Sequence, residues 1–111
     1  RRAAFGAAEE IMEEVTLLSR SPLTIALRKE LDAANSEEFY LTVRSFYDAS
    51  PSDIVFACDG LEFIDSTALG TFVKILKMVK TDGHSLTIRG LSDRIRKLFV
   101  ICALDRIMEI E

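Results

Sequence analysis

The chain has 111 residues, a length typical of one compact domain, and 49% of them are hydrophobic, which is enough for a core that needs no disulfide or metal. The formal net charge of −4 argues against nucleic acid or an anionic membrane surface as the main partner, because both attract basic surfaces. No apolar run approaches the roughly 20 residues of a membrane span, and no signal-peptide pattern follows Arg1 and Arg2, so we expect a soluble, cytoplasmic protein.

Residues 1–14 are rich in alanine and glutamate and precede the first β-type run. Ala8 and Met12 fall on one helical face, but Gly6 weakens a helix there. A linker from a larger protein or a frayed end is therefore favoured over a leader helix, and the domain itself is expected over residues 15–111. The chain begins with arginine rather than methionine, so an excerpt from a longer protein stays among the alternatives.

Two short β-type runs open the predicted domain, at residues 15–18 and 23–27, and a turn-forming segment that ends in Pro22 separates them. This pattern predicts a hairpin in which Pro22 stands at a strand start, where its missing N–H is tolerated. Next, Asp32 or Asn35 can cap a helix with an apolar inner face. That face carries Phe39, Val43, Phe46 and Tyr47.

The most apolar run of the chain, residues 54–58, predicts a strand that is covered on both faces or lies deep in a sheet. The pair Asp59-Gly60 is expected to close this strand. A helix follows over about residues 66–80, with apolar residues at the spacing of a core-facing helix, and Asp82-Gly83 ends it.

Three further elements are predicted: a strand at residues 86–88, a helix capped by Ser92 and a last strand at residues 107–110. The order is therefore β-β-α-β-α-β-α-β. It implies a single α/β domain with helices packed against a mixed sheet, in which pairing is largely parallel after the opening hairpin. The expected core includes Ile54, Phe56, Leu69, Phe72, Val73, Leu76, Ile88 and Leu98.

The sequence lacks the catalytic, nucleotide-binding and metal-binding motifs that are typical of enzymes. The one histidine, His84, lies in a predicted turn, where we expect it to be solvated, and no GxSxG, GxGxxG or GxxxxGK[ST] pattern is present. Cys58 and Cys102 make no metal-binding spacing and are expected to be two small buried hydrophobes; a redox switch between them would need Cα atoms within about 7 Å. We therefore predict no catalysis, no metal and no cofactor.

The informative segment is Phe-Ile-Asp-Ser-Thr-Ala-Leu-Gly at residues 63–70. It places two hydroxyls, Ser66 and Thr67, at a helix N-terminus directly after the carboxylate of Asp65. Such residues begin many helices as simple N-caps, and physical reasoning alone favours that interpretation. A hydroxyl at this place is also a good phosphate acceptor, because the helix dipole and free N–H groups stabilise a phosphate without unfolding the helix.

The segment at residues 60–70 resembles the phosphorylation signature of the STAS family, specifically of the bacterial anti-sigma-factor antagonists. In those proteins an apolar strand and a short loop lead to Asp-Ser-Ser/Thr-Gly/Ala-Leu-Gly at the start of a helix. Residues 31–34 match the Leu-Asp segment that follows the second strand of the family. Residues 91–98 and 103–107 resemble its closing helix and its Gly-Leu-Asp end, so the resemblance covers about residues 15–111.

The resemblance implies a non-enzymatic domain that switches between partners. An unphosphorylated antagonist of this family binds an anti-sigma factor that is also a serine kinase, and thereby frees the sigma factor. The kinase phosphorylates the antagonist, which leaves, and a serine phosphatase resets it. The acceptor corresponds to Ser66, with Asp32, Asp65 and Thr67 beside it as partner-binding positions. Neither direct nucleic-acid binding nor membrane binding is implied.

Three departures from the family pattern leave the particular partner open. Lys29-Glu30 stand where the family often has a glycine before Leu-Asp. Ala57 stands where an aspartate commonly ends the central strand, and Ala68 replaces the commoner glycine after the two hydroxyls.

Two other interpretations stay open. One is a STAS domain cut from a larger protein, such as a stress-sensing scaffold subunit or the cytoplasmic tail of an anion transporter. The other is a small ligand-binding or enzymatic α/β domain that uses Asp32, Asp59, Asp65 and Ser66 at the strand ends, where open α/β sheets often bind ligands. This last interpretation ranks lowest, because no base, metal cluster or glycine cradle accompanies those groups.

Overall fold

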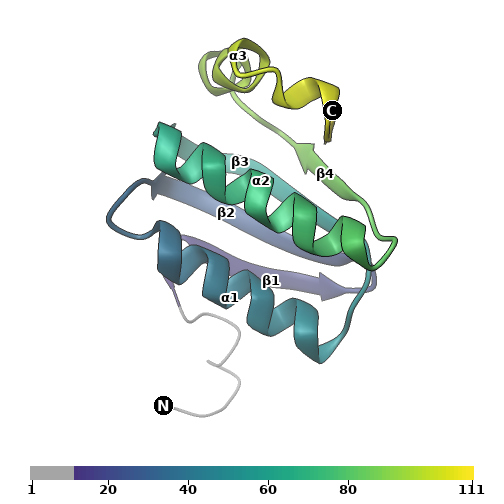
Figure 1. Cartoon of the computed structure of the whole chain (residues 1–111). Coiled ribbons are helices and arrows are strands. Elements are labelled where there is room, and N and C mark those ends of the chain that lie inside the picture. Colours follow the sequence, from purple (N-terminus) through teal and green to yellow (C-terminus); the bar gives the residue numbers. More distant parts are fainter. Residues whose placement is uncertain (1–11) are drawn as a thin grey trace.

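The computed structural model describes residues 12–111 (Figure 1). Its elements follow the predicted order β-β-α-β-α-β-α-β, which confirms the mixed α/β fold. They are β1 (Val15–Arg20), β2 (Leu23–Leu31), α1 (Ser36–Ala49), β3 (Ile54–Ile64), α2 (Ser66–Thr81), β4 (Leu86–Arg89), α3 (Asp93–Ile101), a 3-10 turn (Leu104–Arg106) and β5 (Glu109–Ile110). Most of the N-terminal segment, residues 1–11, lies outside the described residues, so the interpretations offered for it stay predictions.

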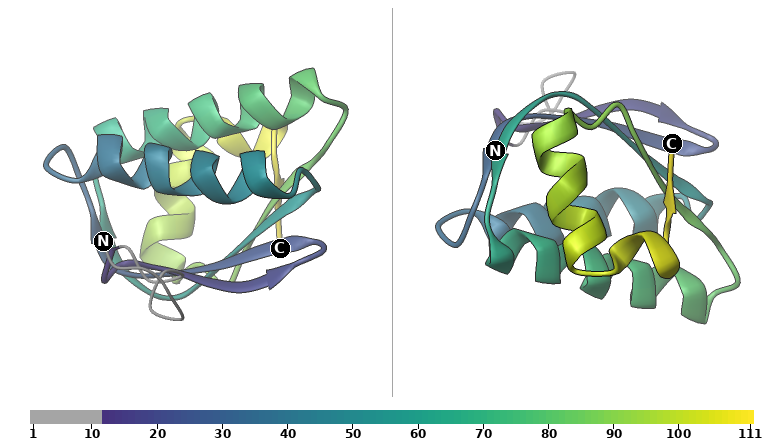
Figure 2. Two further views of the ribbon diagram at one scale, coloured as in Figure 1. Left: turned by 90° about the horizontal axis from the view of Figure 1, so that it is seen from below. Right: turned by 90° about the horizontal axis from the view of Figure 1, so that it is seen from above.

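The five strands form one sheet in the order β1-β2-β3-β4-β5. Strands β1 and β2 pair antiparallel, as a hairpin does, and the pairs β2–β3, β3–β4 and β4–β5 are parallel. Helices α1 and α2 lie side by side over one face of the sheet, and α3 lies toward the β4 side of the molecule (Figures 1 and 2). The prediction of a mixed sheet with parallel pairing after the hairpin is therefore confirmed.

The core is organised around the ring of Phe72 on α2. Its centroid lies 5.4 Å from that of Phe39 on α1, 5.3 Å from that of Phe56 on β3 and 5.4 Å from that of Phe99 on α3. All four rings are fully buried, and the edge-to-face contacts of Phe72 are the arrangement that aromatic rings prefer. One side chain thus connects all three helices to the central strand.

The predicted core is correct except at two positions. Val73 and Leu98 are only partly buried, although both pack against the core. Each lies at the border of its helix's inner face: Val73 follows the buried Phe72, and Leu98 precedes the buried Phe99. Because successive residues of an α-helix point about 100° apart, a neighbour of a fully buried residue lands at the edge of the apolar face.

Strands β2 and β3 are longer than predicted, and Asp59-Gly60 does not end β3. The β2–β3 ladder shifts register at two places, so it continues through bulges to the pair Leu31 and Ile64. Gly60 lies against the neighbouring strand, where an added Cβ would stand 2.9 Å from the Cβ of Arg28. Glycine at this position permits a close approach of two strands rather than a turn.

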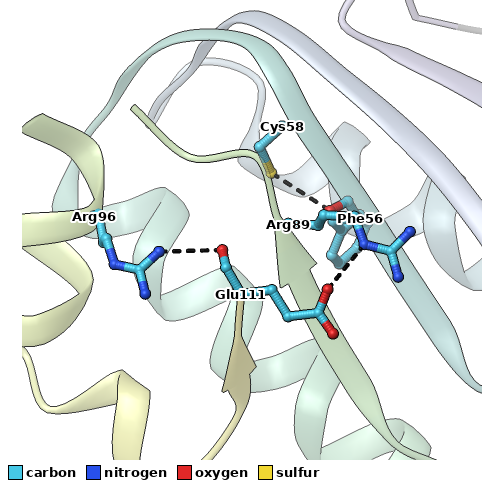
Figure 3. Close-up of polar contacts among 5 residues, drawn as sticks. All are labelled: Phe56, Cys58, Arg89, Arg96 and Glu111. Carbon is cyan, nitrogen blue, oxygen red and sulfur yellow. Dashed lines mark hydrogen bonds and ion pairs between the residues drawn. The ribbon is translucent and has the colours of Figure 1, made fainter. Parts of the chain in front are cut away.

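The C-terminal part also differs from prediction. Only Glu109–Ile110 form the last strand, because the backbone N–H groups of Ile107 and Met108, which follow the 3-10 turn, donate to the carbonyl of Leu104 (3.1 and 3.0 Å) instead. The backbone N–H of Glu111 donates to the carbonyl of Ile88 (2.8 Å). Its side chain accepts from Arg89 Nε (3.1 Å) and its carbonyl accepts from Arg96 (3.1 Å), so it links β4 to α3 (Figure 3).

The two cysteines have different surroundings. Cys58 is buried and lies beside the carbonyl of Phe56 in Figure 3. Burial, and secondarily the charge of Asp59, raise the pKa of the Cys58 thiol to about 12. The prediction that Cys102 is buried was wrong, because this residue follows the end of α3 and faces solvent.

The expectation of a solvated histidine is corrected as well. His84 is half-buried, and its Nδ1 lies 2.6 Å from the hydroxyl oxygen of Tyr47. That hydroxyl donates to Asp82 Oδ2 (2.8 Å). Tyr47 is the last large apolar residue of α1, so this contact ties the end of α1 to the turn that follows α2.

Candidate functional site

The candidate site lies where the adjacent parallel strands β2 and β3 end. Leu31 and Ile64, the last residues of these strands, are partners in the parallel ladder. The two segments that follow them therefore leave the same edge of the sheet, and the backbone N–H of Asp65 donates to the carbonyl of Leu31 (3.3 Å). This register brings Asp32 and Asp65, which are far apart in the sequence, into neighbouring loops.

Asp65 uses both carboxylate oxygens to hold this region together. Oδ1 accepts from the backbone N–H of Ala68 (2.9 Å), which makes Asp65 the N-cap of α2. Oδ2 accepts from the backbone N–H of Ala33 in the loop after β2 (2.9 Å). One side chain thus starts the helix and fixes the neighbouring loop against it.

The loop that contains Asp32 is closed by its own hydrogen bonds. Asp32 Oδ1 accepts from the backbone N–H of Ala34 (3.0 Å), and the N–H of Asp32 donates to Asn35 Oδ1 (3.0 Å). The hydroxyl of Ser36 donates to the Asp32 carbonyl (2.7 Å). Asn35 occupies the N-cap position of α1 but makes no side-chain capping bond, so both candidate caps serve the loop rather than the helix.

Ser66 and Thr67 are the first two residues of α2, and both are exposed. Within residues 12–111 the hydroxyl of Ser66 has no hydrogen-bond partner, because Asp65 has taken the capping role. The hydroxyl lies at the positive end of the helix dipole, where a negatively charged group is stabilised. The Ser66 hydroxyl is therefore accessible, and the start of α2 does not depend on it.

Two residues near the end of β3 were not singled out from the sequence. Phe63, three residues before Ser66, is 48% exposed although it lies in β3. Arg94 of α3 donates from Nη2 to the carbonyl of Glu62 (2.8 Å), so α3 is attached next to the end of β3. The sequence gives no clear signal for the exposure of Phe63, because β3 does not alternate between buried and exposed residues. The Arg94 contact depends on tertiary structure alone.

The residues of the ligand-binding alternative do not all come together. The carboxylate of Asp59 lies beside Gly90, where an added Cβ would stand 2.4 Å from Oδ1. Three surface hollows are lined by residues of α1, of β1, and of the α2–β4–β5 side, and none of these three is lined by Asp32, Asp65 or Ser66.

Two negative findings apply to the described part of the chain, residues 12–111. It contains no group of three or more His, Cys, Asp or Glu side chains that could hold a metal ion. None of its helices is long and apolar enough to cross a membrane.

Comparison with known proteins gives consistent matches. A curated anti-sigma-B factor antagonist of Staphylococcus aureus (strain NCTC 8325 / PS 47) is 33% identical over 81 residues, which are 73% of this chain and 75% of that protein. An anti-sigma-B factor antagonist of Bacillus subtilis (strain 168) is 41% identical over 59 residues; that match spans about half of each protein, 53% of this chain and 54% of the relative.

Solved structures share the fold. The crystal structure of a proposed anti-sigma factor antagonist from Thermotoga maritima has a TM-score of 0.74 at 24% identity, over 86% of this chain and 82% of that one. The anti-sigma factor antagonist SpoIIAA in its unphosphorylated form has a TM-score of 0.63 at 19% identity, over 84% of this chain and 94% of that one. The family model described as STAS domain matches residues 5–111. By this match over nearly its whole length, the chain belongs to the STAS domain family.

Proposed function

We propose that this protein is an anti-sigma factor antagonist that binds its anti-sigma factor while Ser66 is unmodified and is released when Ser66 is phosphorylated. It acts by binding and not by catalysis, and it regulates sigma-factor-dependent transcription in the cytoplasm. Its partners are an anti-sigma factor with serine kinase activity and a serine phosphatase that restores the hydroxyl. The names of the relatives from Staphylococcus aureus and Bacillus subtilis support the antagonist role.

The observation that carries the proposal is that Asp65, and not Ser66, caps α2. Asp65 caps α2 with Oδ1, so the exposed Ser66 hydroxyl is left for a kinase. Thr67 is exposed as well, but we expect Ser66 to be the acceptor because it occupies the position of the family's modified serine. Asp32 contributes by shaping the loop that Asp65 holds, since Asp32 Oδ1 is occupied by the N–H of Ala34.

Electrostatics explains how a phosphate would eject the partner. A phosphoserine carries about −2 of charge near neutral pH, and here it would stand directly after the Asp65 carboxylate. A contact made for a neutral hydroxyl would then have to desolvate that charge and meet repulsion from acidic groups. Like charges placed together at an interface cost several kcal/mol, which corresponds to a loss in affinity of roughly a hundredfold or more.

The decisive experiment uses the purified chain and a panel of purified anti-sigma factors encoded in the genome of the source organism. We expect one of them to bind the wild-type protein, to phosphorylate it with ATP at Ser66, and to release it afterwards. Ser66→Ala should keep the affinity and resist phosphorylation, whereas Ser66→Glu should bind roughly a hundredfold more weakly with an unchanged circular dichroism spectrum.

Thr67→Ala is the matched control, because it removes the neighbouring exposed hydroxyl of the same helix turn. It should bind, and be phosphorylated, like the wild type. Phosphate mapped to a residue other than Ser66, or a Ser66→Glu variant with wild-type affinity, would contradict the proposal.

A further inference from the structure

One of the three surface hollows is formed by segments that lie far apart in the sequence. It has a volume of about 330 Å³ and lies between the C-terminal part of α2, the start of β4 and residues 106–109; we call it the α2–β4–β5 hollow. The other two hollows are each lined by neighbouring residues of a single element, α1 or β1. A concave surface that only the folded chain assembles is the usual form of a small-molecule site, and this volume lies at the small end of the range for such sites.

The floor of the α2–β4–β5 hollow is apolar. Leu76, Leu86 and Met108 line it with buried side chains, whereas Ile107 beside them is 44% exposed. Apolar surface that faces water is unfavourable, and a ligand with an apolar body would remove this surface from water. The floor therefore favours a ligand that is at least partly aliphatic.

Two cationic side chains also line the hollow. Lys80 comes from the last turn of α2 and Arg106 from the 3-10 turn, and both are exposed. Within residues 12–111 neither side chain has a hydrogen bond or an ion pair. A lysine in the last turn of a helix is an ordinary partner of the helix dipole, so Lys80 alone would carry no inference. The dipole of α2 does not explain why Arg106, from a distant segment, lines the same hollow.

One carboxylate, that of Glu109, lines the hollow as well. Two positive charges and one negative charge leave a net charge of +1 on the lining, although the whole chain has a net charge of −4. The hollow is therefore a cationic spot on an acidic protein, and its charge favours an anionic ligand.

We propose that the α2–β4–β5 hollow binds a small aliphatic carboxylate, with the aliphatic chain on the apolar floor and the carboxylate between Lys80 and Arg106. Arginine suits this role because its planar guanidinium can donate two parallel hydrogen bonds to one carboxylate. A water molecule occupies about 30 Å³ in the liquid, so about 330 Å³ has room for roughly ten non-hydrogen atoms, as many as octanoate contains.

The hollow is separate from the acceptor at Ser66. Lys80 follows Ser66 by 14 residues of the same helix, which is about 21 Å along the axis of α2. A carboxylate in the hollow would therefore leave the Ser66 hydroxyl uncovered. The proposal does not depend on the proposed function, because it concerns a different ligand at the other end of the helix.

The test is a titration of the ¹⁵N-labelled chain with octanoate, followed through the amide resonances by NMR. We expect a dissociation constant of about 1 mM or lower, with the shifts confined to residues near 76–86 and 106–109. Butanoate keeps the charge but lacks four methylene groups, and octan-1-ol keeps the chain but lacks the charge. Each should bind about tenfold more weakly than octanoate or worse.

Charge variants test the two cations. Arg106→Gln and Lys80→Gln should each weaken octanoate binding about fivefold, and the loss should be smaller at high salt. Glu109→Gln should strengthen binding about twofold, because it removes the only negative charge of the lining. The matched controls are Arg20→Gln and Lys97→Gln, which each remove one exposed positive charge outside the hollow and should bind like the wild type.

Ser85→Phe tests the hollow itself, because it fills the space from an exposed lining position and leaves both cations in place. It should weaken octanoate binding more than about tenfold, with a melting temperature close to that of the wild type. No saturable shift up to about 10 mM octanoate would overturn the proposal, and so would saturable shifts that map elsewhere. Equal binding of octanoate and octan-1-ol, or wild-type affinity of Arg106→Gln and Lys80→Gln, would overturn the role of the cations. No anti-sigma factor takes part in these measurements, so their failure would leave the proposed function standing.

Discussion

Helices α2 and α3 both have a serine at their N-terminus, but the two serines have different roles. At α3, Ser92 is the N-cap and its hydroxyl accepts from the backbone N–H of Ile95 (3.3 Å). At α2, the cap is Asp65, and the Ser66 hydroxyl that follows makes no hydrogen bond within residues 12–111. Modification of Ser66 would therefore leave the cap of α2 in place, whereas modification of Ser92 would remove the cap of α3.

If α2 and α3 are attached to the core mainly by their apolar inner faces, truncating a buried side chain should destabilise the protein strongly. Leu76→Ala tests this for α2. Leu76 is 5% exposed, and its truncation leaves a cavity beneath the helix. We expect the free energy of unfolding, measured with urea, to fall by about 2–5 kcal/mol, the largest effect among these variants. A loss below roughly half a kcal/mol would mean that the inner face of α2 contributes little.

Asp65→Ala removes the cap that distinguishes α2 from α3. The variant loses the contacts to Ala68 and Ala33, and we expect the free energy of unfolding to fall by about 2 kcal/mol in urea titrations. Asp65→Asn is the control: its side-chain oxygen can still accept from Ala68, but its NH₂ group cannot accept from Ala33, so its loss should be about half as large. Equal losses for the two variants would mean that only one of the contacts matters.

Exchanging each serine for alanine tests the comparison most directly. Ser92→Ala should cost about 1 kcal/mol of unfolding free energy, because it removes a used cap. Ser66→Ala should change that free energy by less than about 0.5 kcal/mol. If Ser66→Ala is the more destabilising of the two, the Ser66 hydroxyl is not free for modification as we have argued.

The opposite end of α2 allows a test by pH. Burial, and then the hydrogen bond with Asp82, raise the pKa of Tyr47 from 10.0 to about 12. The folded state therefore holds the phenolic proton more tightly, so this stabilisation is complete below pH 10 and is lost between pH 10 and 12. Near pH 8 this stabilisation does not change with pH; toward pH 10.5 the urea midpoint of the wild type should fall more than that of Tyr47→Phe. Identical pH profiles would mean that the link between α1 and the turn after α2 does not persist in solution.

Local patterns in the sequence were sufficient for the order of elements and for the capped start of α2. Asp65 followed by two hydroxyls and an amphipathic run predicts a capped helix start, and the structure has one there. The second role of Asp65, its bond to Ala33, depends on the register of β2 against β3 and so on contacts between distant residues.

The predictions that were wrong also involve contacts between residues that are distant in the sequence. Asp59-Gly60 has the composition of a turn, but the close approach of Arg28 on the neighbouring strand shows a bulged ladder instead. The sequence predicts a solvated His84 because its partner, Tyr47, belongs to α1 and is far away along the chain. No local pattern reports such contacts, since they arise only when the sheet and helices assemble.

The two outer strands have a consequence for handling the protein. The sheet ends at one side in β5, which is only Glu109–Ile110, and at the other in β1, whose pairing is irregular between Leu17 and Ser19 and which finishes at the charged, exposed Arg20. Short, irregular or charged edges give an incoming strand little to pair with, so edge-to-edge aggregation is suppressed. Concentrated solutions of the protein should accordingly resist fibril formation, so long titrations and spectroscopic measurements should be practicable.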